Sequence, residues 1–140
     1  MVGVLDKKTL IEAIRQAEAG TSGEIRVHVH RGPTKDALAE ARKLFKRLGM
    51  HRTKERNGVL LFVAPKNHTF AIVGDEGIHR LVGDAFWNTT RDRMQKEFSE
   101  GRLQDGLLAG VKSAGERLKE HFPVKKTDRN ELSNEVTEGR

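Results

Sequence analysis

One short run of residues constrains the fold of this chain more than any other feature. Residues 59–64 read Val-Leu-Leu-Phe-Val-Ala, with Asn57-Gly58 before them and Pro65 after them. The run is far shorter than the ~20 apolar residues that a membrane-spanning helix needs. An unbroken apolar run of this length between turn residues is typical of a strand covered on both faces. It therefore predicts a central strand inside a layered α/β domain.

The segment before this run predicts a second strand. Residues 24–30 alternate between β-branched apolar residues and the polar residues Arg26, His28 and His30. A period of two places the apolar side chains on one face of the sheet and the polar ones on the other. We therefore expect a strand with one covered face.

A helix is expected between these two strands. Apolar residues recur at helical spacing from Leu38 to Leu48, Thr34 is the expected N-cap, Asp36 lies in the first turn and Gly49 ends the pattern. A strand, helix, strand unit makes its two strands parallel. After a turn at residues 65–68, residues 69–73 predict a third strand that pairs antiparallel with the central one.

The remaining periodic segments predict helices at residues 7–19, 78–82, 84–98 and 103–121, with Asp6 and Asp84 as caps for the first and third. Together these elements predict a three-layer α/β/α sandwich with a small mixed sheet, occupying residues 1–123. Residues 124–140 are highly charged and contain few apolar residues, so we expect a disordered tail whose deletion leaves the melting temperature nearly unchanged.

Composition excludes several classes of function. The chain has no cysteine, which removes disulfides, thiolate zinc sites and cysteine nucleophiles. The N-terminal residues contain no long apolar run, so we expect a cytoplasmic protein without a membrane anchor. The formal net charge of +6 suggests anionic partners, such as a phosphate-bearing ligand or an acidic protein. Nucleic acid binding through the basic loop at residues 50–56 is a distant alternative, because no recognised nucleic-acid-binding motif is present.

The topology predicts a site at one edge of the sheet. The starts of the first two strands and the end of the third meet there, which brings together Glu24, Asn57, Asp75 and Glu76. Carboxylate and amide oxygens are the ligands of hard cations, so this group predicts a Ca²⁺ or Mg²⁺ site. The predicted helix before the central strand ends on the same edge. Basic residues there would hold an anion above the cation, namely Arg47, Arg52 and Arg56.

Each residue of this group also has an ordinary structural explanation. Asp75 and Glu76 suit a helix N-terminus, Asn57-Gly58 suits a turn and Glu24 suits the start of a strand. His28 and His30 share a strand face, but no third metal ligand is fixed by spacing. Neither a P-loop nor a nucleophile elbow is present. The neighbouring Phe86 and Trp87 are interpreted as core or groove lining.

Four segments, in this order, resemble the TPM domain family. They are TSGEI at residues 21–25, NGVLL at 57–61, FAIVGDEGI at 70–78 and GRLQDGL at 101–107. The family occurs in thylakoid lumen phosphatase-like proteins, photosystem repair factors and many bacterial proteins. The resemblance implies an α/β/α sandwich, a divalent cation, usually calcium, in some members, and acid phosphatase activity attributed to some. This sequence departs from the common form, because Gly-Asp-Glu-Gly-Ile-His stands where many members have Gly-x-Gly-x-Glu.

Two functions of different classes follow. The first is a TPM-like domain that binds Ca²⁺ or Mg²⁺ at the acidic sheet edge and acts as an interaction or repair module. The second is a metal-assisted phosphomonoesterase, in which the cation polarises a phosphoryl oxygen. Binding is favoured, because kinship of fold does not carry catalysis and no activated nucleophile is visible.

Overall fold

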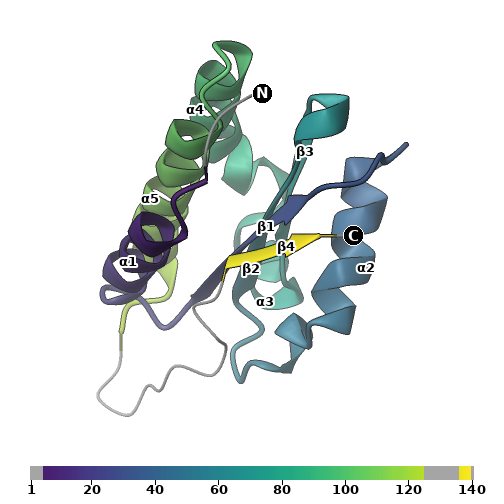
Figure 1. The fold of residues 1–140 in the computed structure, drawn as a ribbon. Helices are drawn as coiled ribbons and strands as arrows, with labels where there is room; N and C mark the ends of the chain where they lie inside the picture. Colours follow the sequence, from purple (N-terminus) through teal and green to yellow (C-terminus); the bar gives the residue numbers. More distant parts are fainter. Residues whose placement is uncertain (1–4, 125–135, 140) are drawn as a thin grey trace.

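The structure is a computed structural model that describes residues 5–124 and 136–139. Its centre is a sheet with the strand order β3-β2-β1-β4 (Figure 1). The strands are β1 (Glu24–His30), β2 (Gly58–Ala64), β3 (Thr69–Gly74) and β4 (Val136–Gly139). Strand β1 is parallel to β2 and to β4, whereas β3 is antiparallel to β2.

Strand β2 lies inside the sheet, between β1 and β3. All seven of its residues are buried, and Phe62, the most accessible of its large side chains, is 1% exposed. The prediction drawn from its apolar run is therefore confirmed. The predicted parallel crossover and the antiparallel hairpin are confirmed as well.

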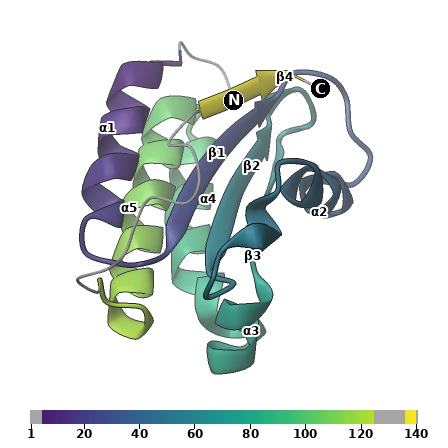
Figure 2. The same ribbon diagram turned by 90° about the horizontal axis from the view of Figure 1, so that it is seen from below.

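Helices cover both faces of the sheet (Figures 1 and 2). One face carries α1 (Lys7–Glu18), α4 (Asn88–Ser99) and α5 (Leu103–His121), which form the larger core with side chains such as Leu61 and Val111. The other face carries the crossover helix α2 (Ala37–Arg47), which packs through Leu44 and Phe45. This arrangement is the α/β sandwich that the sequence predicts. No helix within the described ranges combines the length and apolar character needed to span a membrane.

The polar face of β1 differs from expectation. The alternating pattern predicts one covered face, yet every residue of the strand is buried. The rings of His28 and His30 lie against Phe62, with ring centres 5.5 and 5.3 Å away. The face is covered because the crossover helix α2 packs over this side of the sheet. The period of two in the sequence therefore shows which side chains of β1 are polar, but it does not show that they are exposed.

Three helix starts also differ from the sequence prediction. Asp36, not Thr34, caps α2, and its side chain accepts a hydrogen bond from the Ala39 amide at 3.1 Å. The short helix α3 begins at Glu76 and ends at Val82, with Asp75 as its cap. Residues 84–87 form a 3₁₀ turn, so α4 begins at Asn88 and the predicted cap Asp84 does not start it.

The end of the chain departs furthest from the prediction. Residues 124–140 were expected to be a disordered tail, but Val136–Gly139 form β4 and add a strand beside β1. Val136 is 9% exposed and joins the larger core. Glu138 lies 3.2 Å from Lys7 and 2.5 Å from Arg31. Residues 125–135 and 140 lie outside the described residues.

Candidate functional site

The predicted sheet edge brings together segments that are distant in the sequence. Glu24 is paired with Gly58 in the register of β1 and β2, and the Asp75 amide donates to the Gly58 carbonyl at 2.9 Å. The Glu24 amide lies 3.4 Å from the Asn57 carbonyl oxygen. The backbone convergence on which the predicted cation site depends is therefore present.

The Asp75 side chain is engaged by Arg56. Two guanidinium nitrogens of Arg56 donate to the two carboxylate oxygens of Asp75, both at 2.8 Å. Asp75 also accepts from the Glu76 amide at 2.7 Å and is 5% exposed. Glu76 lies 3.4 Å from Arg56 and 2.7 Å from Arg80. The hydrogen bond from Arg56 to Asp75 raises the pKa of Arg56, so the guanidinium stays charged.

Arg56 reaches Asp75 because the backbone turns sharply before β2. Its φ is 53°, in the left-handed region that non-glycine residues seldom occupy. Arg56 was expected to face an anion from the mouth of the site, and the structure instead pairs it with two of the proposed metal ligands. Arg47 and Arg52 are exposed at the end of α2 and in the 3₁₀ turn after it.

Glu24 and Asn57 occupy a second, more buried part of the same edge. Glu24 is 3% and Asn57 1% exposed. The Asn57 side-chain amide donates to Ser22 Oγ at 3.1 Å, and Ser22 Oγ lies 3.3 Å from Glu55. Glu18 approaches from α1 and accepts from the Ile25 amide at 2.8 Å. Burial raises the pKa of Glu18, whereas hydrogen bonds with the Ile25 amide and the Glu24 side chain act in the opposite direction.

The structure thus divides the predicted metal ligands into two groups. Asp75 and Glu76 are held with Arg56, while Glu24 lies with Glu18 and close to Asn57. Among the residues that the structure describes, there is no group of three or more His, Asp or Glu side chains that could hold a metal ion. Cation binding at this edge stays a prediction.

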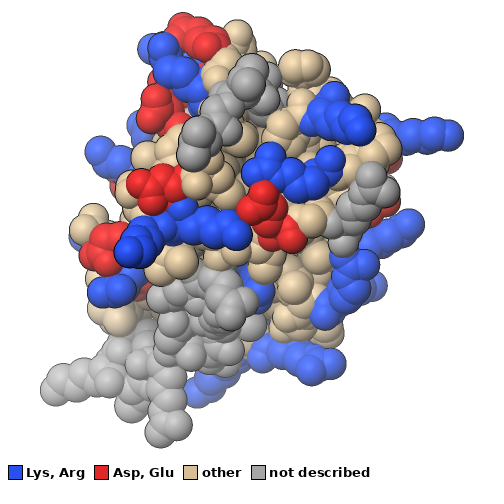
Figure 3. Space-filling model, in the orientation of Figure 1, with Lys and Arg blue, Asp and Glu red and all other residues tan. Residues whose placement is uncertain are grey.

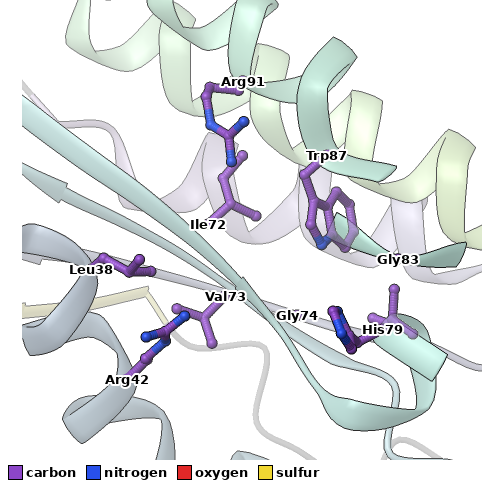
Figure 4. Close-up of a pocket in the computed structure, with 10 residues that line it drawn as sticks. Leu38, Arg42, Ile72, Val73, Gly74, His79, Gly83, Trp87 and Arg91 are labelled. Atoms are coloured by element: carbon purple, nitrogen blue, oxygen red, sulfur yellow. The ribbon is translucent and has the colours of Figure 1, made fainter. Parts of the chain in front are cut away.

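A pocket of about 520 Å³ lies beside this edge, between α2 on one side and α3 and α4 on the other (Figure 4). Its floor is the outer part of β3. Arg42 from α2 and Arg91 from α4 both point toward that strand, and Trp87 faces it near Gly74. None of the ten described residues that line the pocket is acidic. The pocket therefore offers cationic groups over an apolar floor.

Trp87 fixes the shape of the pocket where β3 ends. It is 6% exposed, and a Cβ added to Gly74 would come within 2.7 Å of its ring nitrogen. A side chain at position 74 would displace the indole, so glycine keeps the space between strand and ring. The interpretation of Trp87 as groove lining agrees with this position.

The two arginines of the pocket, Arg42 and Arg91, are not among the site residues predicted from the sequence. Leu38 and Arg42 are four residues apart on α2, and so are Trp87 and Arg91 at the start of α4. Side chains at this spacing lie on one face of a helix, so a signal was present in each segment. Figure 3 shows that Lys and Arg gather on the side of the molecule where α2 lies. Nothing in the sequence shows that the two faces converge on the edge of β3.

The chain also resembles a known protein family. A model described as the TPM domain matches residues 2–117. A search of curated proteins gives no match.

Among solved structures, the chain resembles the NMR structure of the BA42 protein from the psychrophilic bacterium Bizionia argentinensis. The two are 42% identical with a TM-score of 0.90, over 99% of this chain and 98% of the other. The N-terminal domain of cg2496 from Corynebacterium glutamicum is 16% identical with a TM-score of 0.64, over 89% and 80% of the two chains. An N-terminal domain from P. gingivalis is 20% identical with a TM-score of 0.65, over 82% and 74%. These two more distant likenesses concern the fold alone.

Proposed function

Because the chain belongs to the TPM domain family, we propose that it is a binding module whose ligand presents an anionic group to the pocket beside β3. The observation that carries this proposal is the lining of the pocket, in which Arg42 and Arg91 reach β3 from opposite walls and no described lining residue is acidic. Hydrogen bonds to charged groups contribute about 1.5–3 kcal/mol each. Two such contacts would orient a carboxylate or phosphate above the apolar floor.

The composition supplies a direct test, because Trp87 is the only tryptophan of the chain. Its fluorescence reports on the pocket without a label. Benzoate, phenyl phosphate and benzamide would be titrated separately; benzamide has nearly the shape of benzoate but no charge. We expect the two anions to change the fluorescence with saturation and benzamide to have a much weaker effect.

Two variants assign the response to the arginines. Arg42→Gln and Arg91→Gln should each weaken anion binding by about tenfold, which corresponds to the loss of one charge-assisted hydrogen bond. Arg93→Gln is the matched control, since Arg93 lies on the same helix as Arg91 but pairs with Glu116 at 3.3 Å. Equal responses to benzoate and benzamide, or equal losses in all three variants, would refute the proposal.

A divalent cation at the acidic edge is a second candidate. It is favoured by the burial of Glu24 and by the burial that raises the pKa of Glu18, since a cation would offset the cost of holding these carboxylates away from water. The test is the shift in melting temperature on adding Ca²⁺ or Mg²⁺ to chelator-treated protein. Glu24→Gln should abolish any shift, and Asp105→Asn is the control.

The contacts of Asp75 and the position of Asp105 explain why Glu24→Gln is the test variant and Asp105→Asn its control. Asp75→Asn would also weaken the contact with Arg56 and the cap of α3, so its loss of stability would not report on metal alone. Asp105 lies in the first turn of α5, whereas the Phe122 carbonyl beyond the other end of that helix accepts from the Ser22 amide at the acidic edge. A nineteen-residue helix is ~28 Å long, so Asp105 is remote from the candidate site.

A phosphomonoesterase activity is the alternative to binding alone. Anionic recognition in the pocket would suit a phosphoryl group, and a cation at the neighbouring edge would supply the Lewis acid. Release of phenol from phenyl phosphate, measured with and without Ca²⁺ or Mg²⁺, distinguishes turnover from binding. Turnover that is lost in both Arg42→Gln and Glu24→Gln would favour the enzyme.

A further inference from the structure

Strand β3 presents an open edge of the sheet. It pairs with β2 on one side, and no other described strand pairs with it on the opposite side. Asp75 donates its amide to Gly58, and Val73 pairs with Leu60 in the same register. Residues of an antiparallel pair alternate in the direction of their N–H and C=O groups. Val73 and Ala71 therefore bond toward β2, while Phe70, Ile72 and Gly74 direct their backbone groups outward.

The pocket follows this outward side of the strand. Ile72 and Gly74 belong to its floor, Leu38 and Arg42 form one wall, and Trp87 and Arg91 lie on the other. The ligand that such a place accommodates is extended, because a row of outward backbone donors and acceptors matches another strand. A compact ligand would leave most of that row unpaired.

The charges of the walls indicate the composition of the added strand. Among the described residues neither Arg42 nor Arg91 forms an ion pair, and Arg91 donates a hydrogen bond to the side-chain oxygen of Asn88 at 2.9 Å. Both residues are exposed, and their side chains point toward β3 in the groove. An incoming strand with acidic side chains would place carboxylates between them, and its apolar side chains would cover Ile72 and Leu38.

The opposite edge of the same sheet holds an example of such an addition. There the short segment Val136–Gly139 pairs with β1, buries Val136 and places Glu138 between Lys7 and Arg31. The chain thus already captures one acidic strand between two basic side chains. The edge of β3 offers the same two elements, unpaired backbone and facing cations, without an occupant among the described residues.

We propose that the edge of β3 accepts an acidic, extended segment of a partner protein as an additional strand, with its carboxylates between Arg42 and Arg91. This proposal rests on the proposed function, because it names the partner that brings the anionic group. It goes beyond the proposed function because it requires main-chain hydrogen bonds between the partner and Phe70, Ile72 and Gly74.

The test uses a pair of synthetic peptides on the full chain. The first is a capped eight-residue peptide with the repeat Val-Val-Glu-Glu, which places valine and glutamate on both faces of the added strand, and the second is the same peptide with every valine amide N-methylated. N-methylation removes backbone donors but keeps all carboxylates. We expect the first peptide to change the Trp87 fluorescence and to slow hydrogen exchange of the Phe70, Ile72 and Gly74 amides at least tenfold. The methylated peptide should bind at least tenfold more weakly.

Further variants and ligands distinguish strand addition at β3 from the binding of an anionic group alone. Arg42→Glu and Arg91→Glu should each reduce peptide binding at least tenfold, whereas Arg93→Glu on the same helix should not. If both peptides bind equally and the three amides exchange unchanged, strand addition is overturned while anion binding stands. If neither the peptides nor benzoate bind, both proposals fail. Unmethylated peptide that protects amides of β1 instead of β3 would also overturn the assignment of the edge.

Discussion

The two edges of the sheet solve the same physical problem in different ways. An unpaired edge strand exposes hydrogen-bonding groups that invite other chains. Beside β1 the edge is closed by β4, a segment of this chain that follows α5 by more than ten residues. Beside β3 no other described strand is paired, and the edge lies in a groove between two helical walls. The first edge is completed within the molecule, and the second is the one at which we propose that a partner adds a strand.

The basic side chains at the two edges also differ in whether they have a carboxylate partner. At the closed edge the cations Lys7 and Arg31 already have the carboxylate of Glu138. At the open edge Arg42 has no carboxylate among the described residues, and the pocket lining supplies none. Basic side chains therefore flank both edges, and carboxylates from the described part of the chain neutralise the pair at the closed edge alone.

The largest effect on stability is expected from Gly77→Ala, in the helix α3 that follows β3. A Cβ at this position would lie 2.1 Å from the Glu55 carbonyl oxygen and 2.6 Å from that of Arg56. Backbone atoms cannot yield cheaply, so we expect a loss of about 2–3 kcal/mol in the free energy of unfolding. Urea denaturation measures it.

Gly101→Ala provides the control for this substitution. Gly101 follows the end of α4 with φ 78° and has nothing within 4 Å of its added Cβ. Only the strain of a positive φ remains, so a loss of about 1 kcal/mol is expected. A Gly77→Ala variant as stable as Gly101→Ala would show that α3 is not held against the residue 55–56 backbone.

The next effect concerns the closed edge. Deleting residues 136–140 removes β4, exposes the side of β1 and returns Val136 to water. Burying a valine side chain contributes about 1.5–3 kcal/mol, and ordering the strand cancels part of it, so we expect a net loss of about 1–2 kcal/mol. This reverses the expectation from composition, under which the tail would be neutral. An unchanged melting temperature would contradict the assignment of β4 as a stabilising strand.

The difference between the edges also explains what the sequence could predict. Strand β2 can be predicted because its six-residue apolar run is a local pattern that does not depend on distant partners. The parallel crossover follows from the order strand, helix, strand. Strand β4 reads Val-Thr-Glu-Gly, which is too short for its two β-branched residues to predict a strand. Its partners lie more than a hundred residues away, as in the 2.7 Å contact between Thr137 and His28. Tertiary context decides such a segment.

The candidate site shows the same limit. The convergence of Glu24, Asn57 and Asp75 was predictable from topology, because strand directions determine which ends meet. The pairing of Arg56 with Asp75 was not, since it depends on a left-handed turn at Arg56 that sequence does not favour. The groove needed the relative positions of α2 and α4, which no local pattern contains.

A smaller, pH-dependent effect should come from His28 beneath the closed edge. Burial, followed by the charge of His30, lowers the pKa of His28 from 6.5 to about 4. Between these values the unfolded chain binds more protons than the folded one, so stability rises with pH across this window and falls on acidification. His28→Gln should flatten the pH profile of stability between pH 4 and 6.5.

Urea denaturation of the wild type and of His28→Gln at several pH values between 4 and 6.5 measures this change. Equal slopes in the wild type and in His28→Gln would show that another group controls the acid sensitivity.

The smallest effect is expected from Glu138→Gln, which tests the neutralisation at the closed edge directly. The hydrogen bond from Arg31, and then that from Lys7, lowers the pKa of Glu138. A lowered folded pKa gives stability that is present above the unfolded value, near 4.5, and is lost as pH falls through the folded one. The pairs are exposed to solvent and screened by salt, so the loss at pH 7 should be about 0.5 kcal/mol and shrink further in high salt. Arg42→Gln at the open edge should cost nothing in the free protein, because that guanidinium has no carboxylate partner among the described residues. If both substitutions destabilised the free protein equally, Arg42 would already be paired within the chain, and the open edge would lack the free cation that an acidic strand requires.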